Sequence, residues 1–389
     1  MVYGGEGLAR VDGEVVLAPF TLPGETVEAE PAGVRHHVRR SRLTSIIEAS
    51  PDRTTAPCPV FGRCGGCHYQ HAGYSAQLRF KRDILVETLR RLGKIEFDPE
   101  AVTIVSGPPY GYRNRAQFHF ASGRIGYREM NSHKLVPIES CPIAAPAIDA
   151  IVAKLNRLVK DSRWPRFLQS LEIFTDDVQI QWNVRETERP VAKHFFEWMA
   201  AEFPGSVAGP LDYAVNEDIF RVSGDSFFQV NRFLVGRLAD LAIGDLRGSS
   251  AWDLYAGVGL FSLPLARRFQ KVQAVESGRS AALDLLANAR RAGLDIAVSQ
   301  TNVETWLETA GAAPDLVVAD PPRAGLGKTA VSRLLALRPA AIVLIACDPA
   351  TLARDLAALT SAYAIEKVTL ADLFPQTFHI ETIVSLRLR

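Results

Sequence analysis

The 389-residue chain lacks a hydrophobic run long enough to cross a membrane, since a transmembrane helix needs about 18 or more consecutive apolar residues. Its first residues also lack the basic-then-apolar pattern of a secretory signal, so we expect a cytoplasmic protein without a membrane partner. Net charge is nearly absent, because 44 Lys and Arg offset 43 Asp and Glu. A surface that binds nucleic acid would therefore have to be a local basic patch.

Cysteine is scarce, with five in the chain. An odd number without a secretory signal argues against a framework of disulfide bonds. Cys58, Cys64 and Cys67 lie within ten residues, and the glycines between them allow the backbone to turn tightly. Cys141 can supply a fourth thiolate to the same centre, which leaves Cys347 for a separate role.

Four thiolates suit either structural zinc or a [4Fe–4S] cluster. Zinc sites usually pair two Cys-x-x-Cys knuckles, whereas here three cysteines are close and one is distant. We therefore favour the iron–sulfur cluster on Cys58, Cys64, Cys67 and Cys141. Unrelated reduced cysteines are the alternative, and their density in this stretch argues against it.

Cys347 follows an apolar run, 340–346, that is typical of a buried parallel strand. Asp348 and Pro349 then break the strand, and 351–359 has a helical pattern. Ligands of open α/β sheets lie beyond the carboxyl ends of strands, so a thiol at this position could act as a nucleophile. A buried structural cysteine is the alternative, which this stretch alone would favour.

The chain divides into three predicted domains. Residues 1–46 show short β patterns, glycine turns and a basic run from Arg35 to Arg42, which predict a small OB-like β-barrel that binds RNA. A solvated charged loop is the alternative for the basic run. Residues 47–217 predict an α+β domain that carries the cysteines, and residues 218–389 alternate strand and helix patterns.

Two features of the central domain leave alternatives open. The amphipathic helix predicted over 74–93 could pack on the C-terminal domain instead. Arg113 and Arg115 lie beside aromatic residues on a predicted strand, which suits contact with RNA phosphates and bases. An ordinary hairpin with an exposed charged face explains these arginines equally well.

The C-terminal domain has features of a nucleotide-binding α/β fold. A strand runs into a turn with Gly257 and Gly259, where a nucleotide-like ligand can approach the backbone. The next strand ends in Glu276, at the position where a carboxylate accepts from ribose hydroxyls. The dehydrogenase fingerprint needs a third glycine, but position 262 is Ser. This succession resembles the class I S-adenosylmethionine-dependent methyltransferases, whose domain is Rossmann-like.

Four motifs in the expected order strengthen that resemblance: DLYAGVG at 253–259, DPPRAGL at 320–326, ACDPATLARD at 346–355 and FPQTFHIET at 374–382. In addition, residues 5–30 resemble the TRAM domain. Together they resemble the RNA 5-methyluridine methyltransferases, in the iron–sulfur and TRAM-containing branch that includes 23S rRNA enzymes. Asp348 departs from the pattern, because the family often has Asn there.

The resemblance implies methylation of carbon 5 of a uridine in RNA, with ribosomal RNA favoured over transfer RNA and a monomeric enzyme. Because carbon 5 is a poor nucleophile, a thiolate must first add to carbon 6. The resemblance assigns this role to Cys347 and the role of general base to Glu381, whose partial desolvation on an apolar strand would raise its pKa. A strand-edge charge is the alternative for Glu381, and we expect His379 to be a packed neighbour.

The resemblance also implies which residues bind the cofactor and the RNA. The cofactor residues are Gln229, Tyr255, Gly257, Gly259, Glu276, Asn302 and Asp320. Arg323 would hold the base or a phosphate beside Arg113 and Arg115, and Arg354 could pair with a carboxylate in the site. We expect the target uridine to be flipped out of its stack.

Three rival functions are weaker. Methyltransferases that act on amino groups place an aromatic residue after Asp-Pro-Pro, whereas position 323 is Arg. DNA cytosine methyltransferases typically have a Pro-Cys loop, whereas Ala346 precedes this cysteine. A non-catalytic RNA-binding protein or chaperone with a structural metal needs neither Cys347 nor Glu381.

Overall fold

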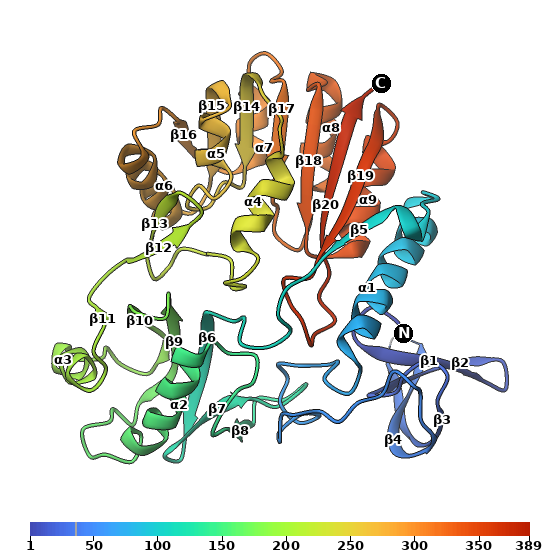
Figure 1. Cartoon of the computed structure of the whole chain (residues 1–389), viewed down its shortest axis with the longest axis vertical. Coiled ribbons are helices and arrows are strands. Elements are labelled where there is room, and N and C mark those ends of the chain that lie inside the picture. Colours follow the sequence, from blue (N-terminus) through green and yellow to red (C-terminus); the bar gives the residue numbers. More distant parts are fainter. Residues whose placement is uncertain (36) are drawn as a thin grey trace.

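The computed structural model describes residues 1–35 and 37–389. The predicted basic run includes His36, which lies outside the described residues. Within the described part, no helix combines the length and the apolar character that a membrane span requires. Figure 1 shows three bodies: a large sheet with its helices at the top, a second sheet at the lower left and the N-terminal strands at the lower right.

The N-terminal body is a four-stranded sheet with strand order β1-β2-β4-β3. Asp12 and Gly13, with φ of 51° and 81°, form the tight turn of the first hairpin, because such turns require positive φ at both central residues. Its strands are β1 (Glu6–Val11), β2 (Glu14–Pro19), β3 (Thr26–Arg35) and β4 (Val38–Glu48). Since β1 and β3 are the edges of this sheet, closure into a barrel stays a prediction.

The central body is a six-stranded sheet with strand order β11-β10-β9-β6-β7-β8. Helix α2 buries Ile148, Ile151, Val152 and Leu155 against this sheet, as their i, i+3, i+4, i+7 spacing predicts. The strands are β6 (Arg115–Ala121), β7 (Arg124–Arg128), β8 (Leu135–Pro137), β9 (Leu168–Thr175), β10 (Ile180–Thr187) and β11 (Ser206–Val207); the helices are α2 (Pro146–Leu158) and α3 (Lys193–Glu202).

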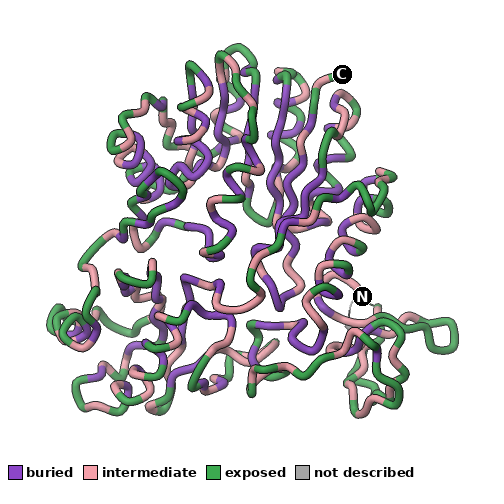
Figure 2. The backbone as a smooth tube through the Cα atoms, viewed as in Figure 1, coloured by how far each residue is buried: buried purple, intermediate pink, exposed green. Residues whose placement is uncertain are grey.

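The C-terminal body is an eight-stranded sheet with order β16-β15-β14-β17-β18-β20-β19-β5, in which β20 runs antiparallel to both neighbours. The strands are β5 (Val102–Val105), β14 (Gly248–Leu254), β15 (Phe269–Glu276), β16 (Ala297–Gln300), β17 (Leu316–Ala319), β18 (Ala341–Ala346), β19 (Tyr363–Ala371) and β20 (Glu381–Leu388). Figure 2 shows that these strands are mostly buried. Strand order reverses between β14 and β17, which is where ligands bind in such sheets.

Helices cover both faces of the eight-stranded sheet and enclose two hydrophobic clusters. They are α4 (Val235–Ile243), α5 (Ser262–Ala266), α6 (Arg279–Ala292), α7 (Val303–Thr309), α8 (Gly327–Leu337) and α9 (Pro349–Leu359). A separate hairpin of β12 (Leu211–Val215) and β13 (Asp218–Val222) precedes them. The α/β methyltransferase-like architecture predicted for this part of the chain is therefore present.

One segment of the predicted central domain lies with the C-terminal sheet. Helix α1 (Tyr74–Thr88), continued by the π-helical turn η1 (Leu89–Gly93), packs Leu85 and Leu89 into the same cluster as Leu356 of α9. After the short 3₁₀ turn η2 (Pro99–Ala101), β5 pairs in parallel with β19. The division at residue 217 therefore differs from the structure, where 74–105 belongs spatially to the C-terminal body.

Candidate active site

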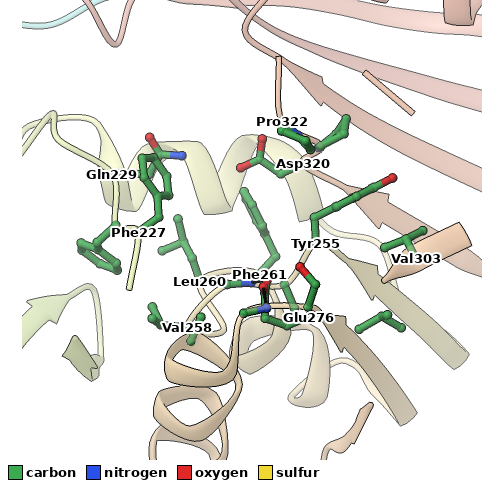
Figure 3. Close-up of a pocket in the computed structure, with 18 of the residues that line it drawn as sticks. Phe227, Gln229, Tyr255, Val258, Leu260, Phe261, Glu276, Val303, Asp320 and Pro322 are labelled. Carbon is green, nitrogen blue, oxygen red and sulfur yellow. Dashed lines mark hydrogen bonds between the residues drawn. The ribbon is translucent and has the colours of Figure 1, made fainter. Parts of the chain in front are cut away.

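A cavity of about 1360 Å³ opens at the carboxyl ends of β14, β15, β17 and β18. Its size exceeds the range of about 300–1,000 Å³ typical of small-molecule sites, so it can hold a nucleoside cofactor together with a second base. Because β20 is antiparallel, its first residue, Glu381, also lies at this edge and lines the cavity. Figure 3 shows Gln229, Tyr255, Glu276 and Asp320 around the same opening.

Cys347 lines the cavity at the end of β18, whose six residues are all buried. Burial raises the pKa of its thiol to about 11, helped by the nearby carboxyls of Glu381 and Asp320 and opposed by Arg323. The following residue, Asp348, caps α9 by accepting from the backbone N–H of Ala350 at 2.9 Å and Thr351 at 3.0 Å. This cap fixes the turn that carries the thiol.

Two carboxyls lie beside the thiol, one buried and one half-buried. Glu381 is 4 % exposed, and burial, together with Asp320, raises its pKa well above the ordinary value. Asp320 follows β17, and burial raises its pKa to about 7. A carboxyl whose pKa lies near neutrality can exchange protons during turnover.

Arg323 and His379 form the polar wall next to these carboxyls. Arg323 Nη2 lies 3.2 Å from His379 Nδ1, and both residues line the cavity. Burial and the Arg323 charge lower the pKa of His379 to about 3. The imidazole is therefore neutral at physiological pH and can accept a hydrogen bond from the guanidinium.

The predicted cofactor residues converge on the other half of the cavity. Glu276, at the end of β15, accepts from the backbone N–H of Gly257 at 2.8 Å and of Gly278 at 2.6 Å. Gly259 has φ of +99°, and a Cβ there would lie 3.0 Å from Leu263 Cδ1, so the turn needs glycine. Gly259 itself is not among the lining residues.

Tyr255 and Asn302 complete this half. Tyr255 has φ of 64° and its hydroxyl donates to Glu304 Oε1 at 3.4 Å. Asn302 lines the cavity while its side chain caps α7 by accepting from Thr305 N at 2.8 Å. These contacts fit an elongated nucleoside ligand, because a glycine turn, an acid and a helix start face one space.

Two of the predicted arginines are placed away from the cavity. Arg115 is 7 % exposed, and its guanidinium donates to Glu172 Oε1 at 2.7 Å and to the carbonyls of Ser226 at 2.8 Å and Gly224 at 2.9 Å. It is therefore an internal tie rather than an RNA contact. Arg354 likewise pairs with Asp355 at 2.8 Å, outside the cavity lining. Arg113, in contrast, lines the cavity.

The fold brings the four predicted cluster cysteines near one another. Burial raises the pKa of Cys67 to about 12, opposed by a bond from Gln70 and helped by the neighbouring sulfurs of Cys141, Cys64 and Cys58. All five cysteines of the chain are free thiols. Over residues 1–35 and 37–389, no group of three or more His, Cys, Asp or Glu has the arrangement that could hold a metal ion. The metal site thus stays a prediction.

Two aromatic residues near the site were not predicted. Phe227 is 65 % exposed, lines the cavity and lies two residues before Gln229. Tyr3 donates to the carbonyl of Cys347 at 3.4 Å and packs edge-on to Phe378. An aromatic residue two positions before a predicted ligand residue could have indicated Phe227. Tyr3 is 344 residues from its partner and has no local signal.

Comparisons with known proteins agree with this site. The model of the tRNA (Uracil-5-)-methyltransferase family matches residues 311–389. A relative described as an uncharacterized RNA methyltransferase of Aquifex aeolicus is 34% identical over 100% of this chain and 97% of its own length. The 23S rRNA (uracil(1939)-C(5))-methyltransferase RlmD of Halomonas elongata is 33% identical over 99% of this chain and 88% of its own length.

The fold has a counterpart among solved structures. The Pyrococcus abyssi tRNA (uracil-54, C5)-methyltransferase, solved in complex with S-adenosyl-L-homocysteine, superposes with a TM-score of 0.78 at 24% identity, over 98% of this chain and 100% of that one. The family predicted from the four motifs is confirmed by the sequence relatives, and the methyltransferase fold by this structure. The chain belongs to the family of RNA (uracil-5)-methyltransferases.

Proposed function

We propose that this protein methylates carbon 5 of a uridine in RNA. The proposal depends on one observation: a thiol, Cys347, and a buried carboxyl, Glu381, line the same cavity as the residues predicted to bind the cofactor. A pure RNA-binding protein needs neither group. S-adenosyl-L-methionine, when bound along Gln229, Tyr255 and Glu276, would supply the methyl group.

The roles of the side chains follow from their protonation. The Cys347 thiol, with its pKa near 11, must lose its proton before it adds to carbon 6 of uracil, and Asp320, with its pKa near 7, can accept that proton. Addition makes carbon 5 nucleophilic enough to take the methyl group. Glu381 then removes the proton of carbon 5, the double bond re-forms and the thiolate leaves.

Ribosomal RNA is the favoured substrate. The support is the Halomonas elongata relative, a 23S rRNA (uracil(1939)-C(5))-methyltransferase that matches this chain almost end to end. Transfer RNA is the second candidate, because the Pyrococcus enzyme acts on tRNA and shares the fold. In either RNA the base would be flipped into the cavity, past the charge of Arg113 and Arg323.

We further propose that Cys58, Cys64, Cys67 and Cys141 hold a [4Fe–4S] cluster. The sulfurs lie close enough for Cys58 to raise the pKa of each of the other three thiols. Gly66 donates its backbone N–H to Cys64 Sγ at 3.4 Å, a type of contact that tunes cluster sulfurs. Because methyl transfer is redox-neutral, the cluster would have a structural or RNA-positioning role.

The test is mass spectrometry of nucleosides from ribosomal and transfer RNA of cells that lack the protein. We expect loss of one 5-methyluridine, restored by the wild-type protein and not by Cys347→Ala. In vitro, RNA containing 5-fluorouridine should give a denaturation-resistant adduct with the wild-type protein only. RNA binding without methylation or adduct would instead identify a non-catalytic RNA-binding protein.

A further inference from the structure

Helix α1 carries three polar side chains on the face that packs against the C-terminal body. Tyr74, Gln77 and Lys81 follow each other at i, i+3 and i+7, a spacing that places them on one side of a helix. Gln77 and Lys81 are 0% exposed. Burying an amide and an ammonium is costly unless both are fully hydrogen-bonded, so their partners indicate what this face is for.

The partners of Lys81 and Tyr74 lie in the connection between β19 and β20, residues 372–380. Lys81 Nζ lies 2.6 Å from Asp372 Oδ1, and both side chains are completely buried. The same ammonium donates to the carbonyl of Phe374 at 3.0 Å. Tyr74 donates to the other carboxylate oxygen of Asp372 at 2.9 Å. The start of the connection is therefore held by a buried ion pair and two further bonds.

Gln77 holds the middle of the same connection through a reciprocal pair of bonds. Its Oε1 accepts from the backbone N–H of Gln376 at 3.0 Å, and its Nε2 donates to Gln376 Oε1 at 2.9 Å. Gln376 has φ of +67°, a left-handed conformation that is costly for a residue other than glycine. A conformation of this kind persists only when its surroundings impose it. The Gln77 side chain helps to impose it by bonding both the backbone and the side chain of Gln376.

The 372–380 connection supplies residues to the active-site cavity. It contains Phe374 and His379, which line the cavity, and it leads directly into Glu381. A nine-residue connection would be mobile if it were not tied down. Most of its ties come from earlier in the chain: α1 on one side, and on the other Tyr112, which donates to the carbonyl of Pro375 at 3.1 Å. The backbone N–H groups of His68 and Tyr69 donate to the carbonyl of Gln376, and Asn231 adds a bond to the carbonyl of Leu373 at 3.0 Å.

We propose that Tyr74, Gln77 and Lys81 are positioning residues for the methyl transfer, which hold the 372–380 connection so that Glu381 and His379 face Cys347. This inference rests on the proposed function. It predicts that loosening the connection impairs the step that needs Glu381 and spares the cofactor half of the cavity. That half is built by the turn at 257–259, between β14 and α5, and by Gln229, which precedes α4.

The reaction separates this role from simple stabilisation. After methyl transfer, the bond between Cys347 Sγ and carbon 6 can break only when the carbon-5 proton leaves to a base and its electron pair re-forms the double bond. If Glu381 is displaced, addition and methyl transfer still take place, but elimination slows. A methylated covalent adduct then accumulates on RNA with ordinary uridine, which partial unfolding alone would not produce.

The experiment compares Tyr74→Phe and Gln77→Met with Arg90→Met, whose native side chain pairs on the surface with Glu87 of the same helical segment. Hydrogen exchange of the 372–380 peptide, the adduct fraction and steady-state kinetics are measured on each full-length protein. We expect kcat of Gln77→Met to fall about 10²-fold, since small displacements cost that much. We expect its adduct fraction to rise, 372–380 to exchange faster, and KM for S-adenosylmethionine to change less than about twofold. Arg90→Met should match wild type.

Each outcome decides the question. A lower kcat with neither adduct nor faster exchange in 372–380 would show a purely structural role and overturn the inference. An unchanged kcat in both variants would overturn it as well. If wild type forms no 5-methyluridine, the proposed function fails and so does the positioning role. The exchange measurement then still reports whether α1 holds the connection, because it needs no activity.

Discussion

Cys347 and Glu381 flank the last register pair of two adjoining strands, because Ala346 of β18 is paired with Thr382 of β20. The thiol leaves β18 where the carboxyl enters β20, so the antiparallel register brings the two groups to one edge. Both side chains face a cavity formed by rigid strands, which suits catalysis that depends on positioning. The adjacency also makes their roles separable by substitution.

Replacing Glu381 with Gln should uncouple the two halves of the reaction. The amide cannot accept the carbon-5 proton, so adduct with RNA should form and persist while turnover falls by about 10²- to 10⁴-fold, the usual contribution of a general base. Denaturing electrophoresis of RNA–protein adduct, beside nucleoside mass spectrometry, measures both. Cys347→Ala is the control and should form no adduct; wild-type turnover in Glu381→Gln would contradict the assignment.

The pH dependence of kcat/KM should follow the carboxyl that takes the thiol proton. The Cys347 thiol, with its pKa of about 11, is protonated at neutral pH, so addition needs an ionised acceptor. Asp320, with its pKa near 7, is ionised only above that value. We expect log(kcat/KM) to rise by about one per pH unit up to about pH 7 and to level off above it. Asp320→Asn should lose this plateau and keep rising into the alkaline range, because its thiol must lose the proton to solvent; a wild-type profile without an inflection near pH 7 would contradict the role of Asp320.

Part of the site could be predicted because its signals are local. A buried apolar run ends at Cys347, a glycine turn precedes β15, and an acid ends that strand; each of these signals is carried by residues adjacent in sequence. The parallel sheet then brings these strand ends together by a general rule.

Other parts depend on partners far along the chain. Arg113 and Arg115 look alike in sequence, yet Arg115 is paired with Glu172, 57 residues away, and only Arg113 reaches the cavity. Likewise, the four residues of β5 carry no signal that they join the C-terminal sheet beside β19. Tertiary pairing decides such cases, and local pattern cannot reveal it.

Substituting these two arginines should therefore give opposite results. Arg115→Met leaves Glu172 with Arg185 and Asn183 and removes the side-chain partner of the Ser226 carbonyl, while the Gly224 carbonyl keeps its bond from Arg185. Breaking a buried pair costs about 3–5 kcal/mol, and the remaining Arg185 contact should keep the loss in the free energy of unfolding at or below this range. Cofactor affinity should fall as well, because Gln229 lies shortly after Ser226, whose carbonyl loses its partner.

Arg113→Met, the matched variant, should lose less stability, since it removes one internal bond, from Nε to the carbonyl of Arg115 at 2.9 Å, and it should weaken RNA binding. Loss of one phosphate contact should reduce the salt dependence of log K by about 0.7 to 0.9. Thermal unfolding, calorimetric titration with the cofactor and RNA binding at several salt concentrations test both variants. Equal unfolding curves for the two would contradict the distinction.

The cysteine site should govern the order of the catalytic connection. The backbone N–H groups of His68 and Tyr69, which follow Cys67 directly, donate to the carbonyl of Gln376 at 2.8 and 3.0 Å. If a cluster holds the 58–67 loop, its loss should release Gln376 and speed hydrogen exchange over residues 372–380. We expect Cys67→Ser to lose the iron, the sulfide and the visible absorbance of the protein, and to show this faster exchange.

The same experiment separates a structural cluster from a redox-active one. Methyl transfer consumes no electrons, so electron paramagnetic resonance of the wild-type protein should show one cluster oxidation state before, during and after turnover. Cys67→Ser should then lose activity in proportion to the disorder of 372–380, with S-adenosylmethionine affinity unchanged because the cofactor residues lie elsewhere. A change of cluster oxidation state in step with methylation would overturn the structural role. Normal exchange in Cys67→Ser would show that the bonds to Gln376 hold without the cysteine site.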